Sequence, residues 1–158
     1  MTAGGEVTLR EATVEDLAII MRHRRGMFSD MGFREEAALA AMEATSTAFM
    51  KAGLESGSYR GWLAQTQAGV VAGGGVLIVG FPSAPQDPSP RRAWIINMYT
   101  EPQYRGCGLG RAILEAVVAW CREQGFECVF LHASSAGRHL YETMGFEPSN
   151  EMRLLLKS

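Results

Sequence analysis

The stretch from Tyr104 to Arg111, which holds three glycines at alternate positions, constrains the fold more than any other part of this sequence. It follows an apolar segment, 93–100, that predicts a strand. It also opens a segment, 108–124, whose apolar residues recur at helical spacing. Glycines let the backbone turn sharply and leave its amides uncovered by side chains. Because these amides would lie at the positive end of a helix dipole, the stretch predicts an anion site suited to a pyrophosphate.

Two common phosphate-binding motifs do not match this stretch. A P-loop requires lysine and then serine or threonine after its last glycine, whereas Arg111 and Ala112 follow Gly110. The dinucleotide fingerprint GxGxxG has a different spacing from Gly106-x-Gly108-x-Gly110. That fingerprint also lies early in its domain, whereas more than 100 residues precede this turn. The spacing therefore argues against both motifs.

The rest of the chain predicts a mixed α/β protein with the element order β-α-α-β-β-β-α-β-α-β. Strands are expected at 7–10, 59–67, 70–80, 93–100, 126–133 and 152–157, and helices at about 14–28, 34–54, 108–124 and 135–144. Thr13 and Asp16 form a capping-box pattern at the start of the first helix. Within the strand at 70–80, Gly73 to Gly75 indicate either a bulge or a close contact with the backbone. We interpret residues 1–158 as one domain without internal repeats.

A second motif lies nearer the C-terminal end. The run from Leu140 to Phe146, LYETMGF, resembles the L-Y-E-x-x-G-F block of the GNAT (Gcn5-related N-acetyltransferase) superfamily. Arg105-x-x-Gly108-x-Gly110 resembles that family's acetyl-CoA signature, R/Q-x-x-G-x-G/A. The two motifs stand in the family's order, and the element order agrees over essentially the whole chain. The resemblance implies a mostly antiparallel sheet flanked by helices, with one splayed pair of parallel strands at 93–100 and 126–133.

The same resemblance implies acetyl-CoA as co-substrate, no metal, and direct attack by a primary amine of a small molecule or peptide. It also assigns CoA contacts, because in this family the amides of the turn wrap the pyrophosphate and the preceding strand pairs with the pantetheine arm. The residues at these positions are Met98, Tyr99, Thr100, Arg105, Gly106, Cys107, Gly108, Leu109, Gly110, Arg111 and Ser134. Ser134 stands where asparagine is frequent in the family, and its hydroxyl still offers a hydrogen bond.

Two residues are the catalytic candidates. By resemblance, Tyr141 lies beside the thioester sulfur and protonates the leaving thiolate, a role that suits a phenol. Asn97 is polar in an otherwise apolar strand and is a candidate for orienting a water or the acceptor. His132 ends a strand and is a weaker candidate for a general base. Glu101 follows its strand in a turn and is expected to face water.

The acceptor pocket is expected, by resemblance, around the connection of the first two helices, residues 23–33. Arg24 and Arg25 in this region offer binding groups for a carboxylate, and Asp30 for an ammonium. The alternative for each of them is an ordinary solvated charge. Nothing in this stretch identifies the substrate.

Composition limits the other classes of partner. The chain has 158 residues, 47% of them hydrophobic, and a formal net charge of -2, so no concentrated basic face predicts nucleic-acid binding. Its 3 cysteines lack zinc-type spacing and are interpreted as reduced thiols of a cytoplasmic protein. The sequence shows no signal-peptide pattern and no run of about 18 apolar residues. We therefore expect no membrane partner. Family precedent makes a homodimer possible.

Two other functions compete with N-acetyl transfer. One is a CoA-binding sensor or regulatory domain without turnover, against which the presence of Tyr141 argues weakly. The other is a nucleotide-binding or interaction module, against which the absent P-loop lysine and the glycine spacing argue.

Overall fold

The computed structural model describes residues 5–157, and across them the chain forms one five-stranded sheet in the order β1-β2-β3-β4-β5. The strands are β1 (Thr8–Glu11), β2 (Tyr59–Thr66), β3 (Gly69–Gly80), β4 (Arg91–Thr100) and β5 (Val129–Leu131). The helices are α1 (Leu17–Asp30), α2 (Glu36–Ser56), α3 (Leu109–Glu123) and α4 (Arg138–Thr143), with 3-10 turns η1 (Val14–Asp16) and η2 (Pro102–Tyr104). Neighbouring strands from β1 to β4 are antiparallel, and β4 and β5 are parallel. This arrangement confirms the predicted mixed, mostly antiparallel sheet.

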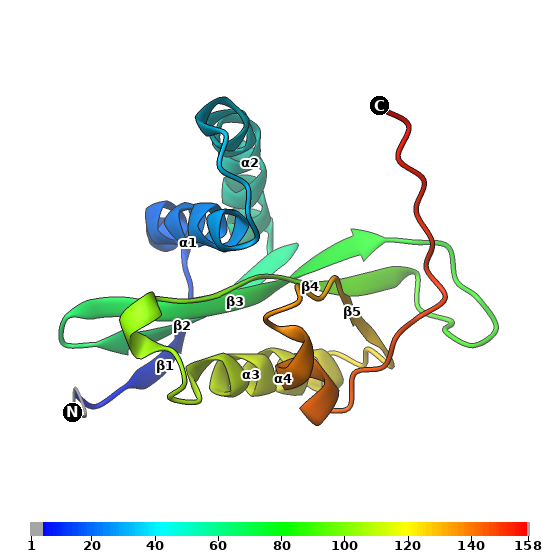
Figure 1. The fold of residues 1–158 in the computed structure, drawn as a ribbon. Helices are drawn as coiled ribbons and strands as arrows, with labels where there is room; N and C mark the ends of the chain where they lie inside the picture. Colours follow the sequence, from blue (N-terminus) through cyan, green and yellow to red (C-terminus); the bar gives the residue numbers. More distant parts are fainter. Residues whose placement is uncertain (1–4, 158) are drawn as a thin grey trace.

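The helices cover the two faces of the sheet in pairs (Figure 1). Helices α1 and α2 lie on one face, and α3 and α4 lie on the other. The predicted capping box is present, because Thr13 accepts from the Glu15 amide while Asp16 accepts from the Thr13 amide. It caps the N-terminal end of η1, which leads directly into α1.

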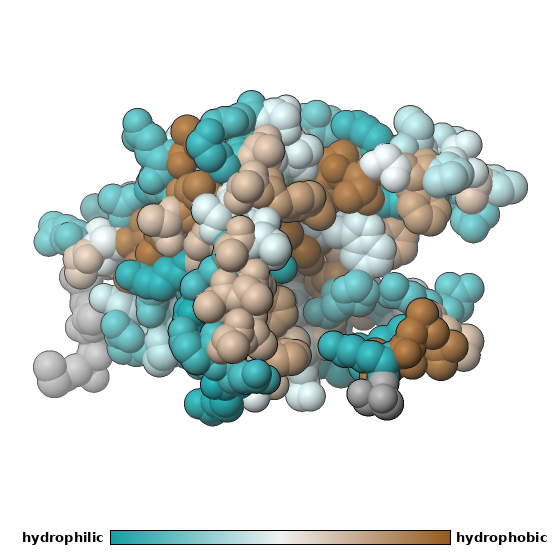
Figure 2. Space-filling model, turned by 90° about the horizontal axis from the view of Figure 1, so that it is seen from above, coloured by the Kyte–Doolittle hydropathy of each residue, from teal (hydrophilic) through white to brown (hydrophobic). Residues whose placement is uncertain are grey.

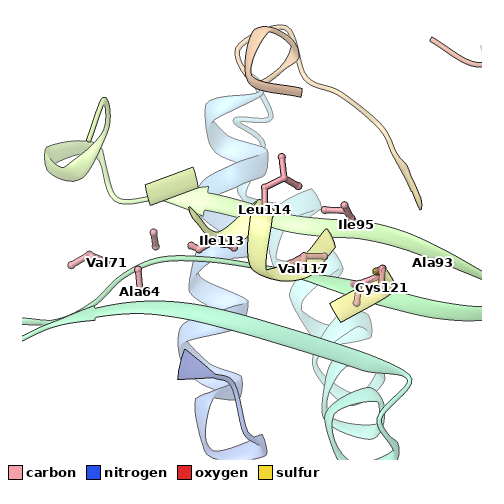
Figure 3. Packing of buried hydrophobic residues seen from close by; sticks show 10 residues of the cluster. Ala64, Val71, Ala93, Ile95, Ile113, Leu114, Val117 and Cys121 are labelled. Carbon is pink, nitrogen blue, oxygen red and sulfur yellow. The ribbon is translucent and has the colours of Figure 1, made fainter. Parts of the chain in front are cut away.

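The face covered by α3 holds the larger apolar core. Helix α3 presents buried side chains at helical spacing, and they meet buried residues of β2, β3 and β4 (Figure 3). The labelled members of this cluster are Ala64, Val71, Ala93, Ile95, Ile113, Leu114, Val117 and Cys121. Burial raises the pKa of the Cys121 thiol to about 11 and keeps it neutral. This core fixes α3, and with it the turn at its N-terminus, against the sheet.

The face covered by α1 and α2 has a smaller apolar core together with buried polar groups. Its apolar cluster consists of Ile20, Met21, Met50 and Tyr59. His23 of α1 is 1% exposed and Asn97 of β4 is 2% exposed, so polar side chains lie inside this layer. Such groups require partners, and Asn97 has two, Arg24 and Tyr59, whereas Nε2 of His23 has no hydrogen-bond partner among the described residues.

A β-bulge in β4 turns Asn97 toward this polar layer. Gly73 pairs with Tyr99 and Gly75 with Ile96, so that Asn97 and Met98 stand opposite Gly74 alone. The sequence predicted either a bulge or a close contact at the β3 glycines, and both are present. The bulge lies opposite Gly74, and a Cβ on Gly74 would collide with the Met98 sulfur. The extra residue places Asn97 beside Ile96 on the α1–α2 face, where regular alternation would have placed it on the α3 face.

Beyond the bulge, β4 has a free edge. Its parallel pairing with β5 covers three residues and ends at the pair Ile95–Leu131, while β4 itself continues to Thr100. The predicted strand at 126–133 is therefore wrong in length, since the structure has strand only over Val129–Leu131. A strand persists only where a neighbouring backbone pairs with it, and here the two strands separate.

The predicted strand at 152–157 is wrong, because the described chain has no strand there. Met152, Leu154, Leu155 and Leu156 are 93%, 81%, 70% and 92% exposed. The segment leaves α4 and runs clear of the sheet (Figure 1), and a strongly hydrophobic group stands off from the molecule at the lower right of Figure 2. Apolar alternation suits a strand, but it supplies no backbone edge on which to pair.

Candidate functional site

The turn before α3 exposes a row of backbone amides. Gly106 and Gly108 have φ of +74° and +81°, the left-handed conformation that favours glycine. Inside α3, the first amide with a helical acceptor is that of Ala112, which donates to the Gly108 carbonyl at 3.1 Å. Within the described part of the chain, the six amides of Gly106–Arg111 have no acceptor. The sequence therefore folds here into a turn of free amides, an arrangement suited to the anion that its glycine spacing predicts.

The two arginines that flank the turn have protein partners. Arg105 donates from Nε to the Thr100 carbonyl at 2.9 Å and from Nη2 to Asp30 at 2.6 Å. Arg111 donates from Nη2 to the Thr143 hydroxyl at 2.7 Å. These contacts tie the turn to the end of β4, to α1 and to α4, so both arginines position the turn in this structure.

Helix α4 places Tyr141 close to the N-terminal end of α3. The neighbouring Leu140 packs against Gly110, and the Tyr141 ring meets Phe146 edge-on at a centroid distance of 5.8 Å. Burial raises the pKa of Tyr141, so that its hydroxyl keeps its proton at neutral pH. Among the described residues, no group hydrogen-bonds to that hydroxyl. Tyr141 is thus a protonated phenol with its donor uncommitted.

Ser134 lies at the beginning of the turn that leads into α4. Its hydroxyl oxygen accepts a hydrogen bond from the Gly137 amide at 3.1 Å. The predicted helix at 135–144 therefore starts too early, since α4 begins at Arg138 and Ser134 stabilises the turn before it. The hydroxyl proton of Ser134 stays available for a further hydrogen bond.

The candidate residues Met98, Tyr99 and Thr100 lie on β4 after the bulge. Met98 packs toward α3, while the Tyr99 ring faces α1, where a Cβ on Gly26 would lie 2.7 Å from its Cζ atom. Met98 thus points to one face of the sheet and Tyr99 to the other, and beyond Ile95 no strand of the described chain pairs with this edge of β4. The structure brings this edge, the glycine turn and α4 together around the C-terminal half of β4 (Figure 1).

Asn97 joins a buried polar group on the α1–α2 face. Its backbone has φ of +62°, and its side chain accepts from Arg24 Nη1 at 2.8 Å and donates to the Tyr59 hydroxyl at 3.2 Å. Burial raises the pKa of Tyr59 to about 12, so the phenol stays neutral. The structure therefore engages the Asn97 side chain in holding Arg24 and Tyr59.

Glu101 does not face water as expected. Its side chain is 18% exposed, forms an ion pair with Arg22, and lies 3.6 Å from Nε2 of His23. Burial is the main cause that lowers the pKa of His23 to about 4, opposed by the negative charge of Glu101. The sequence carried no local signal for this group, because α1 and the end of β4 are far apart along the chain.

The other candidates are less enclosed. His132 has 74% of its side chain exposed, lies 3.1 Å from Glu151, and packs on Trp94 at 5.0 Å between ring centroids.

In residues 5–157, no three His, Cys, Asp or Glu side chains gather in a way that suits a metal ion. Nor does that part of the chain contain a helix with the length and apolarity needed to cross a membrane.

Solved structures share this architecture over nearly the whole chain. A GCN5-related N-acetyltransferase from Ralstonia eutropha JMP134 superposes with a TM-score of 0.90 and 32% identity, covering 96% of this chain and 99% of that one. A predicted acetyltransferase with acetyl-CoA from Clostridium acetobutylicum gives a TM-score of 0.87 and 25% identity, covering 95% and 96%. The fold and the turn thus define an acetyltransferase of the GCN5-related class.

The sequence comparison agrees with the structural one. The model of the acetyltransferase (GNAT) family matches residues 28–146. The chain belongs to this family. Human N-acetyltransferase 8B is 26% identical over 93 residues, which are 57% of this chain and 39% of that protein. The match thus spans less than half of that relative.

Proposed function

We propose that this chain transfers the acetyl group of acetyl-CoA to a primary amine of a small molecule or peptide. The observation that carries the proposal is the row of six uncommitted amides, Gly106–Arg111, at the N-terminus of α3. Amides in this arrangement, together with the helix dipole, bind a pyrophosphate well. Membership of the acetyltransferase family agrees with that ligand.

The neighbouring groups fit the rest of a CoA ester. The free edge of β4 at 98–100 offers backbone donors and acceptors to the amides of a pantetheine arm. The Ser134 hydroxyl offers one more donor on the α4 side. Cys107 lies in the turn with the phosphate-binding amides, so its thiol is not placed to carry the acetyl group.

Acetyl-CoA, when bound, supplies an acetyl thioester. The acceptor nitrogen forms a bond to the carbonyl carbon while the bond from that carbon to sulfur breaks. The amine releases one proton to solvent, and a proton from solvent later restores the phenol that has protonated the sulfur. Tyr141 serves this exchange as the acid that donates a proton to the departing sulfur, because its raised pKa keeps the phenol protonated until then. Asn97 positions Arg24 and the bulge of β4 beside the reacting groups.

Tyr141→Phe tests the catalytic part of the proposal. Release of the thiol from acetyl-CoA with a panel of amines should lose about 100-fold in kcat, because general acid catalysis contributes effects of that size. The dissociation constant of acetyl-CoA should stay nearly unchanged. Tyr104→Phe, at another half-buried tyrosine, is the control. A Tyr141→Phe enzyme with wild-type kcat would contradict the acid role, and no turnover by the wild type on any amine would favour a CoA sensor.

Ligand-induced stabilisation tests the binding part separately. Acetyl-CoA should raise the melting temperature more than ADP does, since a ligand stabilises the state to which it binds. Gly108→Ala should reduce the shift, because it forces a side chain into a left-handed conformation at the turn. Equal shifts from acetyl-CoA and ADP would contradict the CoA site.

We propose further that two copies of the chain form a dimer through the segment at 152–157. Four large apolar side chains of this segment are at least 70% exposed, and β5 is an edge strand with one paired side. An extended segment of one copy that pairs with β5 of the other would satisfy both features. Sedimentation should show a dimer, which L154S/L156S converts to a monomer while F81S does not. A monomeric wild type would contradict the dimer.

We also infer a reducing compartment such as the cytoplasm. Cys107 and Cys128 are exposed and free, as is the buried Cys121. Alkylation during cell lysis should therefore label both exposed thiols. A disulfide-linked species under those conditions would contradict this inference.

A further inference from the structure

Three neighbouring arginines of α1 differ in their partners. Arg22 pairs with Glu101, and Arg25 pairs with both Glu36 and Glu43. Arg24 pairs with no carboxylate among the residues that the structure describes. It is therefore a cation whose counter-ion this part of the chain does not supply.

The surroundings of Arg24 make that lack of a counter-ion costly. Its side chain is half-buried, its guanidinium lies over the Phe28 ring at 5.0 Å, and its Nε atom is buried without a hydrogen-bond partner. Burial of the charge lowers its pKa. The neutral Asn97 amide, at 2.8 Å from Nη1, compensates only part of the lost hydration.

The arginine is nevertheless held in one position. Asn97 accepts from Nη1 only because the bulge turns its side chain to the α1–α2 face, and Tyr59 fixes the other end of that amide. The bulge stands immediately before the free edge of β4 at 98–100. A charge held in one position, with no carboxylate partner within residues 5–157, is what a binding site for an anionic substrate group requires.

We propose that Arg24 binds a carboxylate of the acceptor, so that this enzyme acetylates amines that carry a carboxylate, such as amino acids. This inference rests on the proposed function, which puts the acceptor near Arg24. Its binding test, however, does not require turnover. Phe33, which is 54% exposed, packs edge-on against Phe28, the ring over which Arg24 lies, and so adds an apolar surface next to this cation. Apolar amino acids are therefore the first acceptors to examine.

The decisive measurement is binding, by calorimetry in the presence of CoA, of N-acetyl amino acids and of the matching N-acetyl amino-acid amides. The carboxylates should bind to the wild type at least about tenfold more tightly than the amides, because a charged hydrogen-bonded pair contributes about 1.5–3 kcal/mol. Arg24→Gln should abolish this preference while leaving the affinity for CoA unchanged. Arg24→Lys should retain part of it, since lysine keeps the charge but not the planar fork.

Arg25→Gln is the matched control, because Arg25 is on the same helix but has its own carboxylate partners. It should keep the preference for carboxylates. Equal binding of acids and amides to the wild type, or an equal loss of both in Arg24→Gln, would overturn the inference. So would weaker CoA binding in Arg24→Gln, since Arg24 would then serve the co-substrate.

Turnover separates this inference from the proposed function. With L-leucine and L-leucinamide as acceptors, the ratio of their kcat/KM values should fall about tenfold in Arg24→Gln, mainly through KM. The ratio within one variant cancels the different basicities of the two amines. Carboxylate binding that depends on Arg24, without turnover, would contradict only the proposed acetyl transfer. Turnover without any preference for the acid would contradict only the role of Arg24.

Discussion

The two faces of the sheet are built on different principles. On the α3 face, Ile113, Leu114 and Val117 are fully buried among other apolar side chains. On the α1–α2 face, the buried His23 and Asn97 lie within the packed layer. The first face obtains its stability from apolar burial, while the second holds polar groups that must be satisfied one by one.

The two faces of the sheet therefore contribute differently to the molecule. The α3 face sets the position of the glycine turn, because the same helix that packs on the sheet begins at that turn. The α1–α2 face surrounds the bulge of β4 with groups that hold charges and protons in fixed places. We therefore expect substitutions on the first face to change mainly the free energy of unfolding, and those on the second to change its pH dependence and the reaction.

The largest loss of stability is expected from Leu114→Ala on the α3 face. Truncation of a fully buried leucine leaves a cavity and typically lowers the free energy of unfolding by about 2–5 kcal/mol. Urea denaturation measures the change. Glu123→Ala, at an exposed side chain of the same helix, is the control and should stay within about 0.5 kcal/mol of the wild type. A loss below about 1 kcal/mol in Leu114→Ala would remove the contrast between the two faces.

The next effect is the pH dependence of stability set by His23 on the other face. Burial lowers its pKa from 6.5 to about 4, against the opposing charge of Glu101 and with that of Arg22. The unfolded chain thus takes up a proton at a higher pH than the folded one. The free energy of unfolding should therefore fall as the pH drops from about 6.5 to about 4, by at most about 3 kcal/mol.

Unfolding free energies measured across that pH range test this prediction. In His23→Gln the fall should be smaller by the contribution of this one group, whereas Gln67→Ala, at an exposed neutral side chain, should keep the wild-type slope. If His23→Gln and the wild type had parallel profiles, the buried histidine would not be the group that responds.

The smallest of the three effects is expected at the bulge. Asn97→Ala removes both side-chain hydrogen bonds and leaves the buried Tyr59 hydroxyl without this partner. The free energy of unfolding should fall by about 2 kcal/mol. Asn97→Gly loses the same bonds but relieves the positive φ of +62°, and should recover about 1 kcal/mol relative to alanine. Thermal denaturation of both variants separates the loss of the hydrogen bonds from the relief of the positive φ. Equal stability of the two would show that the backbone is not strained there.

The accuracy of the sequence predictions follows the range of the interactions involved. The turn at 106–111, the capping box at Thr13 and the helix at 109–123 were predictable, because they depend on residues close together in the chain. The strand at 152–157 was predicted wrongly from the same kind of pattern, since alternation does not reveal whether a partner strand exists. The role of Glu101 was missed because its partners, Arg22 and His23, lie on a distant helix.

Local sequence patterns established the family, the order of the elements as far as α4, and the glycine turn with its row of amides, since glycine conformation and helix periodicity are local properties. The packing of the elements in space set which face Asn97 occupies, which α1 arginine has no carboxylate partner within residues 5–157, and which apolar segment stays exposed. A one-residue bulge reverses the direction of every side chain after it, and an ion pair requires two groups from separate elements. Both depend on how the strands and helices are paired in space, which no single segment encodes.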